Sequence, residues 1–203
     1  MKTFLDAQLY TGCSEDAYEI VGNMQLNFLK LEGCHPDSIV GEIGCGCLCG
    51  GHKIINYLNS GHYIGVDPNS WLIETALETR PELKLKNPRF LSNDDFSLPE
   101  PVDYIISHSI LSHAANWQLP LFFNNLKKSM KSQAKIIASI RFAEKDSNNE
   151  TWQYPGVSYF SWETIETTAR NCNLSVVRRE DLRAMMIEKA PAHHHDWLMV
   201  TLN

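Results

Sequence analysis

Long apolar runs and an excess of basic charge are both missing from this sequence of 203 residues. No stretch approaches the roughly 20 apolar residues that a membrane-spanning helix needs. The opening MKTFLDAQLYTGC also lacks the apolar core of a signal peptide. The chain carries 18 basic and 24 acidic residues, a formal net charge of −6. Because nucleic-acid backbones attract basic surfaces, this balance disfavours nucleic acid as a partner, and we expect no membrane partner either.

A distributed disulfide framework is also absent. The six cysteines stand at positions 13, 34, 45, 47, 49 and 172, and three of them are crowded between Cys45 and Cys49. Such crowding is typical of reduced thiols, so we expect free cysteines and a cytoplasmic protein. Zinc sites usually combine two separated cysteine pairs, and this run lacks the second pair. The sequence therefore predicts no metal site and indicates small buried thiols beside a ligand.

The apolar pattern predicts one α/β domain over residues 1–203, with a helical segment at 1–36 and a sheet-based core at 37–203. The predicted strands are 38–43, 62–66, 89–91, 102–107, 135–142, 174–177 and 197–202, and the predicted helices are 15–31, 50–59, 70–79, 119–130 and 161–171. Ser14, Ser70 and Ser161 are the expected helix caps. Strands that alternate with helices favour a mostly parallel sheet. No helical pattern separates the last two strands, which predicts an antiparallel hairpin at one edge.

A glycine-rich loop, VGEIGCGCLCGG, stands where the first predicted strand gives way to a helix. Glycines allow a tight turn and let the backbone approach a ligand closely. The dinucleotide fingerprint Gly-x-Gly-x-x-Gly is incomplete here, because Cys49 replaces its third glycine. Glu42, two residues before Gly44, suits a cationic ligand better than a pyrophosphate. Both features disfavour a nucleotide-dependent oxidoreductase, which remains an alternative function.

Two acidic segments follow the next two predicted strands. Asp67 lies 21 residues after Gly46, the distance at which an acidic residue binds ribose hydroxyls in nucleotide-binding α/β folds. Asn93–Phe96 combines amide and carboxylate groups with an aromatic ring, a set able to bind adenine. Read separately, Asp67–Asn69 is also a plain turn and Asp94–Asp95 a solvated loop. Because the carboxyl ends of parallel strands meet at one edge, the three elements together predict a ligand site there.

These motifs resemble those of the class I S-adenosylmethionine-dependent methyltransferases, over residues 38–180. GEIGCGCLCGG is similar to the acidic-x-Gly-x-Gly loop of that family, YIGVDPNSWLIETA to its ribose motif and NDDF to its adenine motif. DYIISHSILSH, LKKSMKSQAKIIASI and YFSWETIETTARNCNLSVV resemble its later segments. The bacterial small-molecule type is the most similar. This chain departs from it with Cys49-Gly50-Gly51 in place of Arg-Gly-Gly, and with an expected turn at 131–134 in place of Lys-Pro-Gly-Gly.

The resemblance implies a Rossmann-like, doubly wound, mostly parallel seven-stranded sheet with an antiparallel last strand and helices on both faces. It also implies S-adenosyl-L-methionine as the cofactor. The loop Gly44–Gly46 would pass under the methionine moiety near Glu42, Asp67 would hold the ribose, and Asp94–Phe96 the adenine. The expected cofactor-binding residues are Glu42, Gly44, Cys45, Gly46, Asp67, Pro68, Asn69, Asp94, Asp95, Phe96 and His108.

Two histidines bracket the segment after the fourth predicted strand, near the place where the methyl group is expected. His108 ends the strand, whereas His113 lies where the chain turns into the cleft, so His113 is the candidate catalytic base. The alternative is that either histidine only packs there. A second run, His193–Asp196, is interpreted as a loop lining the substrate cleft or as a plain polar loop.

Aromatic residues gather after the fifth predicted strand and predict either an acceptor pocket or ordinary core packing. They are Trp152, Tyr154, Tyr159, Phe160 and Trp162. The sequence as a whole predicts methyl transfer to a small molecule by a monomer or a homodimer. A catalytically inactive cofactor-binding partner subunit is the alternative outside enzymes. A protein or RNA methyltransferase is a further alternative. Ser107-His-Ser-Ile replaces the Asn/Asp-Pro-Pro-Tyr type of motif, which disfavours methylation of the amino groups of bases or of protein amides.

Overall fold

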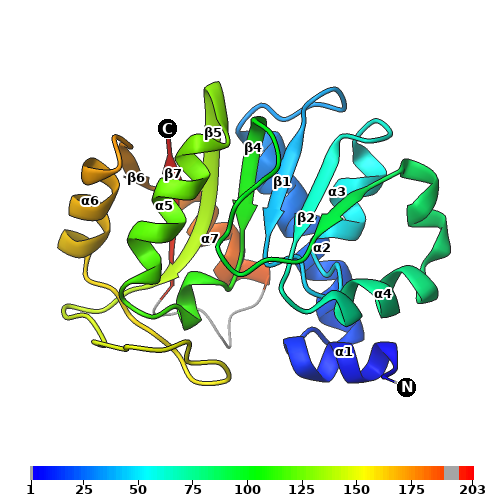
Figure 1. The fold of residues 1–203 in the computed structure, drawn as a ribbon, viewed down its shortest axis with the longest axis horizontal. Coiled ribbons are helices and arrows are strands. Elements are labelled where there is room, and N and C mark those ends of the chain that lie inside the picture. The colour runs from blue at the N-terminus through cyan, green and yellow to red at the C-terminus, as the bar shows by residue number, and fades with distance from the viewer. Residues whose placement is uncertain (1, 190–196) are drawn as a thin grey trace.

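A single mixed sheet forms the centre of the computed structural model, which describes residues 2–189 and 197–203 (Figure 1). Its strands are β1 (Val40–Ile43), β2 (Tyr63–Val66), β3 (Arg89–Leu91), β4 (Val102–Ser107), β5 (Met130–Arg141), β6 (Val176–Arg178) and β7 (Trp197–Leu202). They follow the order β3-β2-β1-β4-β5-β7-β6, and β7 runs antiparallel to both β5 and β6. The Rossmann-like, mostly parallel seven-stranded sheet with an antiparallel last strand is therefore confirmed.

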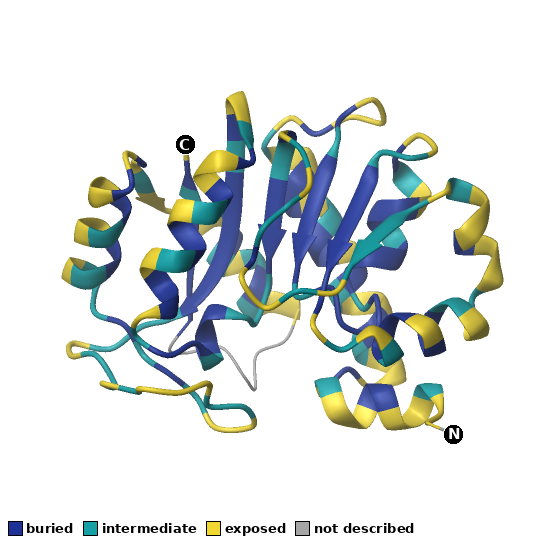
Figure 2. Cartoon of the chain, in the orientation of Figure 1, coloured by how far each residue is buried: buried dark blue, intermediate teal, exposed yellow. Residues whose placement is uncertain are grey.

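Helices cover both faces of this sheet (Figure 1). They are α1 (Phe4–Thr11), α2 (Glu15–Leu31), α3 (Gly51–Tyr57), α4 (Ser70–Thr79), α5 (Gln118–Lys128), α6 (Trp162–Asn171) and α7 (Glu180–Lys189), with 3-10 turns η1 (Pro81–Lys86) and η2 (Leu111–His113). Neighbouring strand residues point to opposite faces, so Ile136 packs in one apolar cluster and Ile137 in the other. Figure 2 shows the resulting pattern, with buried central strands between helices whose outer surfaces are exposed.

The predicted caps are right at two helices and wrong at a third. Ser14 Oγ accepts a hydrogen bond from the Ala17 backbone N–H at 3.2 Å, and Ser161 Oγ accepts one from Thr164 at 3.3 Å. Ser70 is the first residue of α4 and makes no cap, because Asn69 occupies the capping position without a side-chain hydrogen bond.

The last two strands are expected to form a hairpin with no helix between them, and this expectation is wrong about the connecting segment. Helix α7 lies between β6 and β7, although those strands pair antiparallel as expected. The helix buries only Leu182 and Met186, so its apolar pattern is too sparse to stand out in the sequence. Helix α1 escaped prediction for the same reason, since Ala7 and Gln8 are its only buried residues, although a Thr3–Asp6 capping box starts it.

The segment at 131–134 is also not the expected turn. It lies inside β5, which begins at Met130 rather than at residue 135. Met130 pairs with Val102, and Lys135 pairs with Tyr104, so the register shifts between these pairs. The intervening residues form an irregularity within the strand. The polar run that suggests a turn is an exposed stretch of extended backbone.

A disulfide between Cys13 and Cys49 corrects the expectation that the cysteines are all reduced. It joins the start of α2 to the loop that precedes α3. Cys34, Cys45, Cys47 and Cys172 are free and buried. Crowding near Cys49 does not prevent the bond, because its partner comes from a segment 36 residues earlier. In the part of the chain that the structure describes, no helix is long and apolar enough to cross a membrane.

This bond is expected to stabilise the fold measurably. Closing a loop of 36 residues removes conformational entropy from the unfolded chain, worth about 4 kcal/mol in the chain-entropy model. Reduction, or Cys13→Ser, should therefore lower the denaturant midpoint and the melting temperature. The matched control is Cys172→Ser, which removes a buried thiol without a disulfide. Identical unfolding curves with and without reductant would show that the bond contributes nothing to global stability.

Candidate active site

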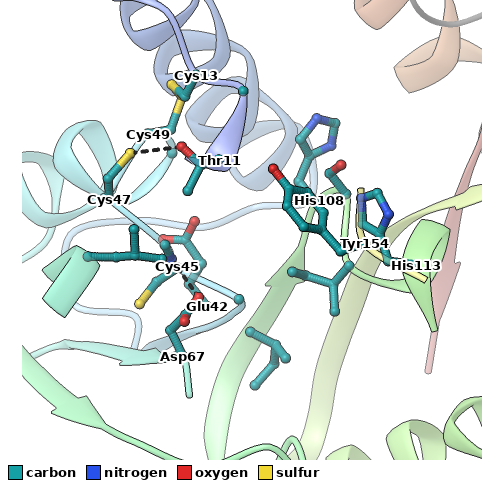
Figure 3. Close-up of a pocket in the computed structure, with 18 of the residues that line it drawn as sticks. Thr11, Cys13, Glu42, Cys45, Cys47, Cys49, Asp67, His108, His113 and Tyr154 are labelled. Atoms are coloured by element: carbon teal, nitrogen blue, oxygen red, sulfur yellow. Dashed lines mark hydrogen bonds between the residues drawn. A yellow bond between two sulfur atoms is a disulfide. The ribbon is translucent and has the colours of Figure 1, made fainter. Parts of the chain in front are cut away.

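A cavity of about 700 Å³ opens at the carboxyl ends of β1, β2 and β4 (Figure 3). One half of its wall is the glycine loop and the end of β2. The other half comes from the segment after β4, from the 152–154 segment and from Trp197. Figure 3 shows these halves facing each other, with Glu42 and Asp67 on one side and His108, His113 and Tyr154 on the other. The predicted elements therefore do converge on one site.

The glycine loop is tied directly to the neighbouring strand. The backbone N–H groups of Gly44 and Cys45 both donate to the Val66 carbonyl, at 2.7 and 3.1 Å. Gly44 has φ +74°, and a Cβ there would lie 1.9 Å from Cδ1 of Ile110. Because any side chain at Gly44 would be strained and would clash, the bare backbone forms the cavity wall at this point.

Asp67 fastens the same loop from the end of β2. Its Oδ2 accepts a hydrogen bond from Gly46 N–H at 3.0 Å, and its Oδ1 accepts one from Asn69 N–H at 2.8 Å. Residues Asp67–Asn69 therefore form a turn, as one of the two interpretations predicts. All three residues also line the cavity. Burial raises the pKa of Asp67 against the opposing effect of these bonds. Asn69 Nδ2 also donates to Oδ1, at 3.3 Å, so Oδ2 is the oxygen that retains capacity for a second donor.

Glu42 lies in the cavity wall and is almost fully buried, at 4% exposure. Its Oε2 accepts a hydrogen bond from the Tyr63 hydroxyl at 2.5 Å. Burial raises the pKa of Glu42 to about 8, and the nearby Asp67 charge adds to this, while the Tyr63 hydrogen bond opposes it. At neutral pH most molecules therefore hold a protonated carboxyl group at this position.

The third motif divides between the cavity and its surroundings. Asn93, Asp94 and Phe96 line the cavity, and the Phe96 ring packs edge-on against Phe122 at 5.3 Å. Asp95 does not line it. Its Oδ1 accepts hydrogen bonds from the backbone and hydroxyl of Ser97, at 3.0 and 2.6 Å. Asp95 therefore organises a turn instead of joining the site.

His113 lies on η2 and lines the opposite half of the cavity. Its Nδ1 is 2.7 Å from the Gly156 carbonyl oxygen, which can only accept, so Nδ1 carries the proton. In the neutral ring this leaves the lone pair on Nε2. Burial lowers the pKa of His113, the Arg141 charge lowers it further, and the Gly156 hydrogen bond opposes both. His113 is therefore a neutral imidazole near pH 7, the form that accepts a proton.

Two of the five predicted aromatic residues stand beside His113. The rings of Tyr154 and Trp152 lie 5.0 and 5.9 Å from its ring, and both line the cavity. The Tyr154 hydroxyl donates to the Tyr10 carbonyl, which links this segment to α1. Tyr159, Phe160 and Trp162 do not line the cavity. Phe160 is fully buried in the core, and Trp162 packs under the Arg178 guanidinium.

His108 and the cysteine run also reach this site. His108 lines the cavity and stacks on Trp197, with the ring centroids 5.5 Å apart. Burial raises the pKa of the Cys45 and Cys47 thiols, so both remain protonated. Within the described residues, no three acidic, histidine or cysteine side chains are placed to hold a metal ion. The His193–Asp196 run lies outside the described residues.

Sequence reasoning missed the part of the wall that comes from the N-terminal helices. The missed residues that line the cavity include Tyr10, Thr11, Gly12, Cys13, Ala17, Ile20, Val21, Met24 and Gln25, together with Ile110, Gln118, Arg141 and Trp197 from elsewhere. Ile20, Val21 and Met24 follow the apolar face predicted for α2. That pattern indicates burial but does not distinguish a face on the sheet from one on a ligand cavity.

Comparison with known proteins bears on both the fold and the site. Residues 42–136 match the model of a methyltransferase domain. A search of curated proteins finds no match. Among solved structures, an S-adenosylmethionine-dependent methyltransferase from Clostridium acetobutylicum has a TM-score of 0.67 at 10% identity, covering 98% of this chain and 96% of that one.

Two further structures share the fold. Magnesium protoporphyrin IX methyltransferase from Synechocystis, solved with bound S-adenosylmethionine, has a TM-score of 0.64 at 14% identity, covering 92% of this chain and 79% of that one. The glycopeptide N-methyltransferase MtfA has a TM-score of 0.67 at 8% identity, covering 90% of each chain. The segment matched by the domain model contains the glycine loop and Asp67, both in the cavity wall. We conclude that residues 42–136 match a methyltransferase domain and that the chain has the fold of S-adenosylmethionine-dependent methyltransferases.

Proposed function

We propose that this protein is a class I S-adenosylmethionine-dependent methyltransferase that acts on a small acceptor with a flat aromatic ring. In this proposal His113 takes the proton which the acceptor loses. The observation that carries the proposal is one cavity with two different halves. The half formed by the glycine loop and the end of β2 presents bare backbone and acidic side chains. It faces a half that holds aromatic rings and the neutral imidazole of His113. A volume of about 700 Å³ lies within the usual range for small-molecule sites, roughly 300–1,000 Å³.

The residues of the first half fit S-adenosylmethionine. Gly44 and Gly46 present backbone without side chains, and Glu42 and Asp67 are acidic groups in a wall that would face a cation. Asp67 would accept the ribose hydroxyls, with Pro68 and Asn69 beside it. The adenine would lie near Asp94 and Phe96. Cys45 and His108 would complete the wall. When bound, this cofactor supplies a methyl carbon on a positively charged sulfur.

The residues of the second half would orient the acceptor. Trp152 and Tyr154 offer apolar faces on which a flat ring can stack, and aromatic pairs favour such contacts. His113 lies beside both rings, at 5.9 Å from Trp152 and 5.0 Å from Tyr154. Holding the acceptor atom in line with the methyl carbon is the main contribution that a protein makes to such a displacement.

His113 is poised to remove a proton from the acceptor atom. Nε2 is the nitrogen that accepts the proton, because Nδ1 already holds one for Gly156. Once protonated, the ring keeps its Nδ1–H bond to that carbonyl, which stabilises the positive charge. Phenols and aromatic amines have acceptor atoms that this imidazole could deprotonate as methyl transfer proceeds.

A screen of matched acceptors tests the proposal. Aromatic and aliphatic pairs of alcohols, amines, thiols and carboxylates would be incubated with protein and S-adenosylmethionine, and methylated products detected by mass spectrometry. We expect turnover with aromatic members only. Turnover confined to aliphatic members would overturn the assignment of the aromatic half. Tight cofactor binding without any turnover would favour the inactive partner subunit.

Asp67→Ala is expected to weaken cofactor binding by at least tenfold. A hydrogen bond from a ribose hydroxyl to the carboxylate would be lost, worth about 1.5–3 kcal/mol, and ~1.4 kcal/mol corresponds to one decade. Calorimetric titration with S-adenosylmethionine measures the change. Asp95→Ala is the matched control, because Asp95 belongs to the neighbouring motif and does not line the cavity. Equal cofactor affinity in both variants would show that Asp67 only organises the turn and does not bind the cofactor.

Trp152→Ala is expected to raise the KM for an aromatic acceptor roughly tenfold, because a stacking face and its buried area are lost. Cofactor affinity should stay the same. Trp117→Ala serves as control, since Trp117 is an exposed tryptophan outside the cavity wall, at 58% exposure. If both variants behave alike, Trp152 does not contact the acceptor.

His113→Asn should lower kcat by ~10²–10⁴-fold at saturating cofactor and acceptor, the usual contribution of a general base. Asparagine keeps a donor for Gly156 but cannot take the proton. In the parent protein kcat should rise with pH through the pKa of His113, which burial holds below 6.5, and level off at neutral pH. In His113→Asn, kcat should no longer rise with pH through this range. Near-parental turnover across neutral pH would leave positioning as the catalytic device.

A further inference from the structure

The carboxyl group of Glu42 and the hydroxyl of Tyr63 form a buried, hydrogen-bonded pair behind the glycine loop. Glu42 lies on β1 and Tyr63 on β2, and these parallel strands pair Val40 with Tyr63. The Tyr63 hydroxyl donates to Glu42 Oε2 at 2.5 Å. Space for this bond comes from Gly51, where a Cβ would lie 2.5 Å from the hydroxyl oxygen and 2.8 Å from Oε2.

The other titratable groups around Glu42 are acids, and the charge of Asp67 disfavours that of Glu42. Asp67 comes from the end of β2, Cys45 and Cys47 from the glycine loop, and Tyr18 from α2. Each of them becomes negative on losing a proton. The Arg80 guanidinium lies beyond, over the face of the Tyr18 ring at 4.4 Å. Among the described residues, Tyr63 is the one whose side chain donates a hydrogen bond to the Glu42 carboxyl group.

We infer that Tyr63 is a positioning residue for the cofactor: its hydroxyl holds Glu42 in the cavity wall and stabilises the charged form that a cationic ligand requires, so that binding of S-adenosylmethionine expels one proton from Glu42 to solvent. The inference rests on the proposed placement of the cofactor against the glycine loop. It assigns a role to a tyrosine that itself does not line the cavity.

The direction of the pH effect follows from the burial of Glu42. Burial raises the pKa of Glu42 to about 8, so the group is mostly neutral at pH 7. A cation binds the ionised form better, and cofactor affinity therefore increases as pH rises toward 8. Removing the Tyr63 hydroxyl takes away the one interaction that lowers the Glu42 pKa. In Tyr63→Phe the pKa of Glu42 is therefore higher, and the rise in cofactor affinity occurs at higher pH than in the parent protein.

The test compares four proteins in calorimetric titrations with S-adenosylmethionine between about pH 6 and 9.5, each in two buffers of different ionisation enthalpy. They are the parent protein, Tyr63→Phe, Glu42→Gln and the control Tyr57→Phe. Tyr57 donates its hydroxyl to the Cys34 carbonyl at 3.0 Å and lies outside the cavity wall. Glu42→Gln gives the pH dependence that belongs to the ligand and to Asp67, against which the other profiles are compared.

We expect the parent protein and Tyr57→Phe to release a proton near neutral pH that Glu42→Gln does not release. Tyr63→Phe should bind roughly tenfold or more weakly at pH 7 and approach the parent affinity at the alkaline end. An unchanged Tyr63→Phe profile would overturn the inference, as would equal weakening at every pH, which indicates a structural role only. Parent protein that shows no binding at any pH would instead overturn the proposed cofactor site itself.

A second readout does not depend on the Tyr63 variant folding. Infrared difference spectra of the parent protein at pH 7, with and without cofactor, should show loss of a protonated carboxylic acid band, and Glu42→Gln should lack that change. A spectrum in which this band persists after cofactor binding would overturn the proton release.

Discussion

The attachment of the glycine loop to β2 is the constraint on which the rest of this site depends. The backbone N–H groups of Gly44 and Cys45 donate hydrogen bonds to the Val66 carbonyl, and that of Gly46 donates to the Asp67 carboxylate. These bonds hold the loop against the end of β2. This holds bare backbone against the cavity and places Glu42 below it. Because Gly44 carries no side chain, Ile110 from the segment after β4 packs directly against the loop.

The cavity has an uneven distribution of charge that suits its chemistry. Acidic groups are concentrated in the half formed by β1 and β2, where the proposed cationic ligand would lie. The half formed after β4 holds a neutral imidazole and aromatic rings. Burial raises the pKa of Glu42 and lowers that of His113, so desolvation favours the neutral form of both groups. Ligands, rather than solvent, would then decide when either group becomes charged.

Sequence patterns predict the sheet well because each central strand is an apolar run buried on both faces. They fail at α1 and α7, each of which buries only two residues, and at the 131–134 segment, where polar residues extend a strand. Short helices with few buried residues leave little periodic signal. The disulfide is missed for a different reason, since the pairing of Cys13 with Cys49 depends on how α2 packs beside the glycine loop.

The sequence by itself determined which edge of the sheet carries the predicted motifs, because a residue that follows a parallel strand must lie at the carboxyl edge of the sheet. That rule places Asp67 and the segment after β4, with His113, at one edge, and Glu42 lies near the carboxyl end of β1 before it. Only the tertiary structure decided which neighbours complete the site: Asp95 turns away toward Ser97, the N-terminal helices supply Tyr10, and Tyr63 reaches Glu42. These contacts join segments far apart in the chain, and packing in three dimensions, not local pattern, sets which side chains meet.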